Sequence, residues 1–317
     1  MSPLPISVCI PVLNEERNLG PCLRSLEGRF DDVVVVDSGS TDATRSIAAA
    51  GGAQLIDFRW NGEFPKKRNW ALRNHPFRHP WILFLDADER LTPQVIVELE
   101  RTIPGSRCAG YWLSFANWFM GRPLRHGDVF RKLALFRRDA GEYERFPERW
   151  WSHLDMEVHE HPVLEGEVGT FEAALEHHDY RDLDHYLAKH NAYSTWEANR
   201  FRWLQSTDDP SVWQALTRRQ RFKYQNLDRW WLSWLYFAAS YFGKLGFLDG
   251  WAGWTFARLK SRYFDDIRLK ILERQRTPPA EEAGRASGSR PVSRPEGVAE
   301  AVPGGESQTE LTGSAGS

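Results

Sequence analysis

Asp86 and Asp88 are the residues of this 317-residue chain whose spacing most clearly indicates chemistry. They stand two apart at the end of an apolar run, in Leu85-Asp-Ala-Asp-Glu89. Two carboxylates near one point bind Mg²⁺ or Mn²⁺ through hard oxygen ligands, and such ions keep positions open for phosphate oxygens. The ion neutralises charge that builds on a departing diphosphate. We therefore predict that Asp86 and Asp88 hold Mg²⁺ or Mn²⁺, rather than being solvated loop charges.

Two further polar clusters follow apolar runs nearer the start of the chain. Asp37 follows four valines, and a carboxylate there can accept hydrogen bonds from a ribose hydroxyl or a base N–H. Asp42 ends a Ser-Thr-Asp sequence that is typical of a helix N-cap. We expect Asp37 to contact a nucleoside and Asp42 to cap a helix. The other cluster, Asn14-Glu-Glu16, follows the first apolar run.

The apolar runs that carry these clusters are predicted strands, and helical patterns separate them. The predicted strands are Ile6–Val12, Val33–Val36, Ala53–Phe58 and Trp81–Leu85, with helices near 19–26, 41–50, 65–73 and from residue 93. This alternation indicates an α/β fold with a mostly parallel, Rossmann-like sheet and helices on both faces. Ligands of such sheets bind beyond the carboxyl ends of the strands, so the three clusters should line one edge. Alternating runs at Gly110–Phe115 and Lys132–Phe136 predict further strands, some antiparallel.

Three motifs in this order and spacing resemble those of the family 2 glycosyltransferases, which have the GT-A fold. They are Pro11-Val-Leu-Asn-Glu-Glu16, Val36-Asp-Ser-Gly-Ser-Thr-Asp42 and Leu85-Asp-Ala-Asp-Glu89, and Lys66-Lys-Arg-Asn69 matches the basic segment near the donor diphosphate. The resemblance covers roughly residues 5–180. It implies a nucleotide-sugar donor, with uridine diphosphate the family's usual carrier. The residues it assigns to the donor are Pro11, Asn14, Glu15, Asp37, Arg68, Asn69 and Asp86.

Two later motifs, Val158-His-Glu160 and Gly246-Phe-Leu-Asp-Gly250, resemble a subgroup with lipopolysaccharide core β-1,4-glucosyltransferases and exopolysaccharide enzymes. The family resemblance implies an inverting reaction, which needs a general base for the acceptor hydroxyl. The Glu-Asp pair that supplies this base in many relatives does not occur in the equivalent region. We favour Glu160 as the base, with Asp155 as the alternative. On a strand, Asp155 and Glu157 would share one face and Glu160 would take the other.

Three histidines, His161, His177 and His178, are candidates for a further metal ligand, because some GT-A enzymes use a downstream histidine. Hydrogen-bonded loop or edge histidines are the interpretation that we favour. Arg131, Arg137 and Arg138 bracket a predicted strand, where an arginine can contact a diphosphate or lie on a solvent face.

The second half of the chain is predicted to be helical and basic. Residues 183–276 indicate about four helices, and residues 200–276 carry 15 Lys and Arg against 7 Asp and Glu, a net +8. Only 14 uncharged residues lie between Arg229 and Lys244, fewer than the about 20 that a spanning helix needs. An aromatic face beside basic residues suits a helix in the membrane interface, and a bundle core is the equal alternative. Residues 277–317 contain no aromatic residue and are predicted to be a disordered tail.

These observations predict three regions: a GT-A domain over 1–180, a helical acceptor or membrane-proximal region over 181–276, and the tail. The predicted activity is nonprocessive, metal-dependent hexosyl transfer to a lipid-linked or cell-envelope glycan. We expect the chain in the cytoplasm, peripheral on the inner face of an anionic membrane. The net charge of −2 speaks against a nucleic-acid partner.

Two other classes remain as alternatives to a glycosyltransferase. A sugar nucleotidyltransferase usually has a glycine-rich basic loop after its first strand, where this chain has the acidic Asn14-Glu-Glu16. A noncatalytic scaffold at a membrane would use the Trp-rich helices and would not need Asp37, Asp86 and Asp88 together.

Overall fold

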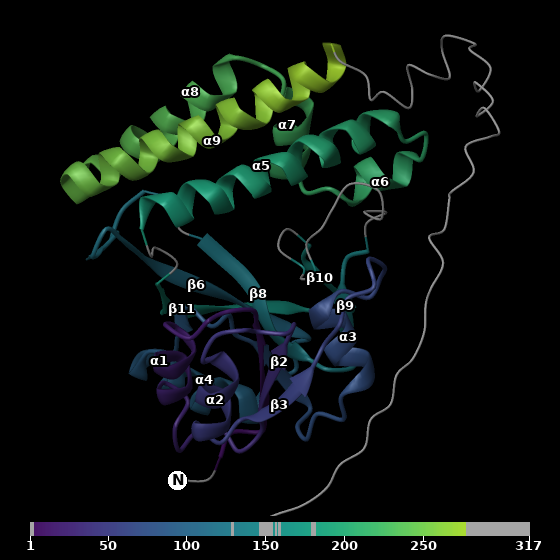
Figure 1. Cartoon of the computed structure of the whole chain (residues 1–317), viewed down its shortest axis with the longest axis vertical. Helices are drawn as coiled ribbons and strands as arrows, with labels where there is room; N and C mark the ends of the chain where they lie inside the picture. The colour runs from purple at the N-terminus through teal and green to yellow at the C-terminus, as the bar shows by residue number, and fades with distance from the viewer. Residues whose placement is uncertain are drawn as a thin grey trace, which may run out of the picture. The chain divides into compact units, whose positions relative to one another are not determined.

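The computed structural model describes residues 3–127, 130–145, 155, 157, 160–178 and 182–276 (Figure 1). Contacts join residues 1–275 into one compact unit. The predicted disordered tail, 277–317, lies outside the described residues. The predicted boundary at residue 180 stays a prediction.

The first four strands form the parallel part of the main sheet. They are β1 (Ile6–Val12), β2 (Val33–Asp37), β3 (Gln54–Asp57) and β4 (Trp81–Phe84). β1 lies between β2 and β4, β3 lies outside β2, and every pairing among them is parallel. The predicted α/β sheet is therefore confirmed. The carboxyl ends of β1, β2 and β4 meet at one edge, which we call the rim.

The remaining strands extend the sheet and add antiparallel pairs. They are β5 (Glu89–Arg90), β6 (Gly110–Phe119), β7 (Arg122–Pro123), β8 (Phe130–Arg137), β9 (Gly141–Tyr143), β10 (Pro162–Leu164) and β11 (Val168–His177). The order across the sheet is β3-β2-β1-β4-β8-β6-β11-β5, with β7 on β6. β8 is antiparallel to both β4 and β6, as predicted, while β11 is parallel to β6. The start of β8 and the end of β11 therefore reach the rim.

Helices cover both faces of the parallel strands. They are α1 (Leu19–Arg24), α2 (Thr44–Ala50), α3 (Lys67–Asn74) and α4 (Pro93–Thr102). Alternate side chains of β1 point to opposite faces: Ile10 packs in the cluster that contains Leu19 of α1, whereas Cys9 packs in the one that contains Ala71 of α3. Because the strands are buried on both sides, they read as continuous apolar runs in the sequence.

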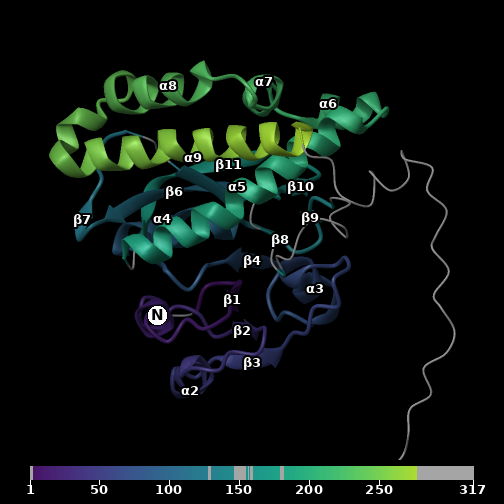
Figure 2. The ribbon, with the colours of Figure 1, turned by 45° about the horizontal axis from the view of Figure 1, so that its top comes forward.

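The second half of the described chain forms a helical layer (Figure 2). Its helices are α5 (Leu183–Ser206), α6 (Pro210–Ala215), α7 (Arg218–Asn226), α8 (Trp231–Ala238) and α9 (Gly250–Arg276), with a π-helix at Ala239–Gly243 and a 3-10 turn at Gly246–Asp249. α9 packs against α5 and α8 through Phe264, Ile267 and Ile271. About four helices were predicted over this region, and five α-helices form there. None of the described helices is both long and apolar enough to span a bilayer.

The two interpretations of the Trp-rich helices, a bundle core and an exposed aromatic face, apply to different residues. Trp196 is buried in the layer and Trp231 packs against its core. By contrast, Trp230, Trp234, Trp251 and Trp254 are exposed. The layer thus has an aromatic core and, separately, aromatic side chains of which about half or more is exposed.

Asp249 fastens the helical layer to the sheet. Its carboxylate accepts hydrogen bonds from the backbone N–H groups of Arg125 (3.1 Å) and His126 (2.8 Å), and its Oδ1 lies 3.2 Å from Nδ1 of His126. The Gly127 N–H donates to the Lys244 carbonyl (2.8 Å). The Gly246–Gly250 motif therefore ties the start of α9 to the loop between β7 and β8.

Replacing Asp249 with Ala should lower the free energy of unfolding by about 2 kcal/mol or more, because two backbone donors lose a charged acceptor. Urea unfolding of the full chain measures this difference. The matched control is Asp208→Ala, at an exposed position of the same layer, which should stay within about 0.5 kcal/mol of the wild type. Equal stability of the two variants would contradict the fastening role.

Candidate active site

The loops after β1 and β2 are joined at the rim by the residues of the first two polar clusters. The Asn14 N–H donates to Oγ of Ser40 (2.9 Å), and Asn14 Oδ1 accepts from the Thr41 N–H (2.9 Å). Asn14 has a φ of 56°, in the left-handed region that asparagine tolerates better than most residues. The Glu15 N–H donates to Oγ1 of Thr44 (2.7 Å). These bonds fix the rim loops before any ligand binds.

Pro11 and Asp42 have structural positions beside this loop pair. Pro11 is buried in β1 opposite Val36. Asp42 accepts hydrogen bonds from the backbone N–H (3.0 Å) and hydroxyl (2.5 Å) of Thr44, the first residue of α2. The N-cap position of α2 is Ala43, which provides no side-chain cap, so Asp42 lies one residue before the predicted cap position and binds the first residue of the helix from there.

Asp37 is fully buried at the end of β2. It accepts hydrogen bonds from the Ser40 backbone N–H (3.1 Å) and hydroxyl (2.5 Å), and Nη1 of Arg45 lies 2.7 Å away. Burial alone would raise the pKa of Asp37, but the bonds from Ser40 and Arg45 outweigh burial and the pKa is lowered. Asp37 is therefore an anion that can accept further hydrogen bonds.

Asp86 receives two cations. Nη2 of Arg68 lies 2.5 Å from Oδ1 of Asp86, and Nζ of Lys132 lies 2.8 Å from Oδ2. Lys132 also lies 3.2 Å from the buried Glu89 carboxylate. Burial would raise the pKa of Asp86, but Arg68 and Lys132 bring it far below its ordinary value. Both oxygens of Asp86 are thus engaged by protein side chains.

Asp88 lies beside the end of β11. Nε2 of His177 is 3.7 Å from Oδ2 of Asp88, and the His178 N–H donates to the Asp88 carbonyl (2.8 Å). Burial would raise the pKa of Asp88, but His177 lowers it to about 2. His177 also meets the Asn117 side chain (3.1 Å). Of the three candidate histidines, His177 is therefore the one whose ring approaches the Asp-x-Asp motif.

The residues Lys66–Asn69, at the start of α3, bind the segment that contains the predicted base. The Lys67 N–H donates to the Asp155 carbonyl (2.9 Å), and the Arg68 and Asn69 N–H groups donate to the two Glu157 carboxylate oxygens (2.8 and 3.0 Å). No side chain of α3 itself caps these groups. The segment thus satisfies three N–H groups that a helix start leaves unpaired.

The side chains of the same helix start bind the remaining carboxylates. Nζ of Lys66 lies 2.6 Å from the Glu160 carboxylate, and Nζ of Lys67 lies 3.2 Å from that of Asp155. Ser38, in the loop after β2, also donates to the Asp155 carboxylate. Glu160 is nearly buried, with 2% of its side chain exposed, whereas 27% of the Asp155 side chain is exposed.

The expectation of a strand here, with Glu160 on the opposite face from Asp155 and Glu157, was wrong. The described residues of 155–160 form no strand. All three carboxylates meet the start of α3, because its N–H groups and cations attract each of them. Val158 and His159 lie outside the described residues.

The structure brings most predicted site residues together and adds others. Asp86, Arg68 and Asn69 share one network with Glu157, while Arg137 and Arg138 donate to backbone carbonyls away from the rim. Lys132 was missed, although a lysine at the rim end of an otherwise apolar strand was a readable signal. Glu157 carried no such signal, because its partners are backbone groups 88 and 89 residues away.

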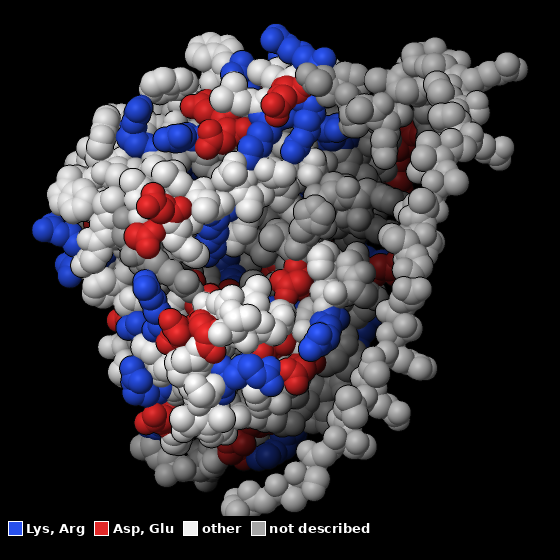
Figure 3. Space-filling view, viewed as in Figure 1, with Lys and Arg blue, Asp and Glu red and all other residues white. Residues whose placement is uncertain are grey.

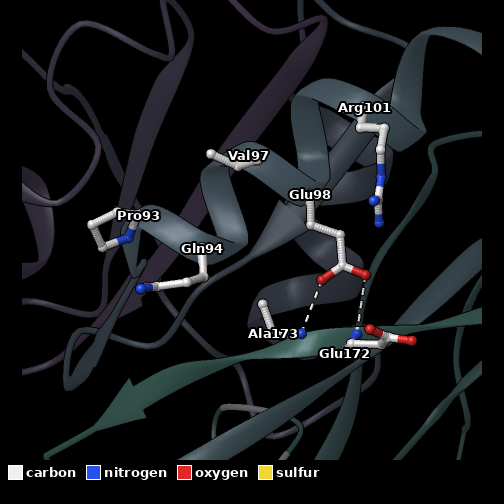
Figure 4. A pocket seen from close by; sticks show the side chains of 7 residues that line it. All are labelled: Pro93, Gln94, Val97, Glu98, Arg101, Glu172 and Ala173. Carbon is white, nitrogen blue, oxygen red and sulfur yellow. Dashed lines mark hydrogen bonds between the residues drawn. The ribbon is translucent and has the colours of Figure 1, made fainter.

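A pocket of about 400 Å³ lies apart from the predicted site residues, between α4 and β11 (Figure 4). Glu98 of α4 accepts hydrogen bonds there from the N–H groups of Glu172 (3.0 Å) and Ala173 (2.9 Å). These two residues lie where the pairing of β11 with β6 shifts register. Glu98 thus satisfies backbone groups that the irregular strand leaves unpaired.

Comparison with known proteins gives a consistent result. The family model "Glycosyl transferase family 2" matches residues 7–152. The lipopolysaccharide core biosynthesis glycosyltransferase LpsC of Rhizobium meliloti (strain 1021) is 32% identical over 206 residues, which cover 62% of this chain and 72% of LpsC. An uncharacterized glycosyltransferase of Rickettsia bellii (strain RML369-C) is 25% identical over 77% of this chain and 80% of its own length. The solved glucosyl-3-phosphoglycerate synthase of Mycobacterium tuberculosis, in complex with Mn²⁺ and UDP-glucose, is 26% identical over 37% of this chain and 44% of that chain, with a TM-score of 0.28.

The lowered pKa of Asp37 predicts a pH dependence of stability. The contribution of its anion is fully present above the unfolded value of 3.8 and is lost as pH falls through the lower folded pKa. The gap in unfolding free energy between the wild type and Asp37→Asn should therefore shrink between about pH 6 and about pH 2. Urea unfolding in chelator-containing buffer measures the gap, with Asp139→Asn, on an exposed turn, as the control. A gap that stays constant or widens on acidification would contradict this assignment.

Proposed function

Because this chain belongs to glycosyltransferase family 2, we propose that its rim transfers a sugar from a nucleotide-sugar donor to a glycan hydroxyl with inversion at the anomeric carbon. The chain is a glycosyltransferase, so the nucleotidyltransferase and the noncatalytic scaffold are set aside. The donor, the stereochemistry and the acceptor belong to the proposal. The observation that carries it is the network at the start of α3, where Arg68 meets Asp86 and Lys66 meets Glu160.

The proposed donor site lies across the rim loops. Asp37 is a buried anion suited to a ribose hydroxyl or a base N–H, and the fixed loop of Asn14 and Glu15 lies beside it. Arg68 and Asn69 reach the same edge from α3, so a guanidinium is available to a diphosphate. We propose uridine diphosphate as the carrier.

The donor set at Asp86 and Asp88 fits a hard divalent cation. Among the described residues, no three His, Cys, Asp or Glu side chains gather as a metal site. Mg²⁺ does not need three, since it usually binds through one or two carboxylates together with substrate phosphate oxygens. Asp88 is the better-placed ligand, because Arg68 and Lys132 engage both oxygens of Asp86. A bound Mg²⁺ or Mn²⁺ would supply charge neutralisation for the diphosphate.

The proposed base acts on the acceptor side of the rim. Glu160 is held by Lys66 and Asp155 by Lys67 and Ser38, so both carboxylates are hydrogen-bond acceptors at the start of α3. Burial lowers the pKa of the neighbouring His161, and Arg200 and Lys223 of the helical layer act on its charge. The charges of the layer therefore act on this segment, which supports a place for the layer on the acceptor side.

We propose a lipid-linked or cell-envelope glycan as the acceptor, on the cytoplasmic face of an anionic membrane. LpsC is named for lipopolysaccharide core biosynthesis, which supports an acceptor of this class. The net charge of +8 over residues 200–276 supports contact with an anionic surface.

The test of the overall function is release of nucleoside diphosphate from a panel of nucleotide sugars, with Mg²⁺, Mn²⁺ or chelator present. We expect slow, metal-dependent hydrolysis of one donor without acceptor and faster release with a lipid-linked glycan. The anomeric configuration of the product, read by NMR, tests inversion. Retention of configuration, or equal rates in chelator, would contradict the proposal.

Replacing Asp88 with Asn should lower turnover at least tenfold, about 1.4 kcal/mol of transition-state stabilisation, because the proposed metal loses a ligand. The fold should persist, since the side chain contacts only the rim. The control is Asp139→Asn, which should keep full turnover and the wild-type melting temperature. If the Asp88→Asn variant keeps more than about a tenth of the wild-type turnover, Asp88 is not a metal ligand.

Replacing Glu160 with Gln should lower turnover by about 10²–10⁴ while donor binding persists, because the volume is kept and the base is lost. Asp155→Asn is the matched comparison, since both carboxylates pair with a lysine at the start of α3. Donor binding is measured by ligand-induced thermal shift and turnover by diphosphate release. If Asp155→Asn alone abolishes turnover, the base is Asp155.

A further inference from the structure

Six exposed large apolar residues lie in the segment that joins α8 to α9 and in the first turns of α9. This segment forms the left-hand end of the helical layer in Figure 2. We call the six residues the apolar tip: Phe242, Leu245, Phe247, Leu248, Trp251 and Trp254. Between 43% and 60% of each residue is exposed. Single exposed apolar residues are ordinary, but six within the short stretch 242–254 indicate an interaction site.

The apolar tip is held in place rather than loose. Asp249, inside it, binds the backbone of Arg125 and His126, and the Lys244 carbonyl accepts from Gly127. Gly246 and Gly253 let two segments meet, since a Cβ on Gly253 would lie 2.0 Å from the Gly246 carbonyl oxygen. The backbone of the tip is therefore ordered without a partner.

Half-buried rings pack against the exposed ones. Tyr241 packs edge-on against Phe242, Phe247 and Trp254, with centroids 5.0–6.2 Å apart. Phe237 packs against Trp254 at 5.2 Å. The Arg122 guanidinium lies 5.9 Å from the ring of Trp251. The tip thus presents a preformed apolar surface, which costs less conformational entropy on binding than a flexible one.

The apolar tip is energetically unfavourable in the free protein, because it combines backbone strain with exposed apolar side chains. Leu245 has a φ of 61°, a left-handed conformation that is unfavourable for a side chain other than glycine or asparagine. Its side chain is also exposed, so burial does not compensate for the strain. Strain and exposed apolar area at one place point to a bound partner.

The charges around the apolar tip select the partner. Lys244 lies within the tip segment, the Arg122 guanidinium lies over the ring of Trp251, and the backbone of Arg125 binds Asp249. Asp249 is the one acid between residues 242 and 254, and its carboxylate is committed to backbone donors. Figure 3 shows Lys and Arg spread over the part of that face where α5 and α9 lie, with acidic side chains among them. Apolar side chains beside these cations match an anionic bilayer, whose headgroups attract each cation and whose interface accepts Trp.

We propose that the apolar tip inserts into the interface of an anionic lipid bilayer and is the membrane anchor of this enzyme. This inference rests on the proposed function, because it takes the acceptor to be linked to a membrane. The six side chains of the apolar tip would make the contact with the bilayer. The exposed Trp230 and Trp234 of the same layer lie outside the anchor as defined.

The test is co-sedimentation of the full chain with vesicles of equal parts phosphatidylglycerol and phosphatidylcholine at low salt. Leu248→Glu should weaken binding at least tenfold, because a charge replaces an inserted side chain. The matched control is Leu269→Glu, which changes an equally exposed leucine of α9 outside the tip (57% against 55% exposed) and should bind as the wild type does. Phe247→Ser/Leu248→Ser is a second tip variant, and melting temperatures verify that each variant folds.

Other outcomes would overturn the proposal. A wild type that does not sediment, or Leu248→Glu and Leu269→Glu variants that bind equally, would exclude the anchor. Light scattering that shows a wild-type dimer, and a monomer for Leu248→Glu, would assign the tip to contact between two copies instead. Donor hydrolysis without acceptor distinguishes failure of the anchor from failure of the proposed function. The rate of hydrolysis should be the same in Leu248→Glu and the wild type. If the wild type hydrolyses no donor, the transferase proposal is refuted, whatever the vesicle binding shows.

Discussion

The capping of α3 by a distant carboxylate is the interaction on which the rest of the site depends. α3 begins with Lys67 and Arg68, directly after Lys66, and has no capping side chain of its own, so its first N–H groups would be unpaired. Glu157 accepts two of them and the Asp155 carbonyl accepts a third. Once this segment is held there, the cations of α3 lie against Asp86, Asp155 and Glu160. Removing one partner of such a buried pair costs about 3–5 kcal/mol, so each group fixes the others.

The distribution of cations around Asp86 and Asp88 also determines how a donor and a metal ion would bind. Asp86 is neutralised by Arg68 and Lys132, whereas Asp88, within the described part of the chain, forms its ion pair with the imidazole of His177 at 3.7 Å. A diphosphate would compete with Asp86 for Arg68 and Lys132, and a divalent cation would find its least compensated carboxylate at Asp88. Donor and cation would therefore favour each other's binding through charge, in a site that needs little reorganisation.

The parallel half of the fold could be predicted from the sequence, because its strands are buried on both faces and therefore appear as unbroken apolar runs. The rim residues Asp37, Asp86 and Asp88 could be predicted for the same reason, since each follows such a run directly. The position of Glu160 could not, because Glu157 and Glu160 are placed by contacts to residues at the start of α3, about 90 residues earlier in the chain. Lys132 joins the site only through the antiparallel pairing of β8 with β4, which places residues 46 apart within 2.8 Å. Local sequence patterns indicate burial and turns, whereas these long-range pairings form only when the whole sheet is assembled.

The apolar tip and the rim are connected through one stretch of chain. Asp249 and the Lys244 carbonyl hold the loop before β8, and β8 then carries Lys132 to Asp86. Phe130, at the start of β8, lies under Lys260 and Phe256 of α9, so the helical layer and the strand are packed together. A tip anchored in a bilayer would consequently set the height of the rim above the membrane through packed, hydrogen-bonded elements. An enzyme whose acceptor is fixed in a membrane needs such a fixed height, because transfer requires the hydroxyl within reach of the base.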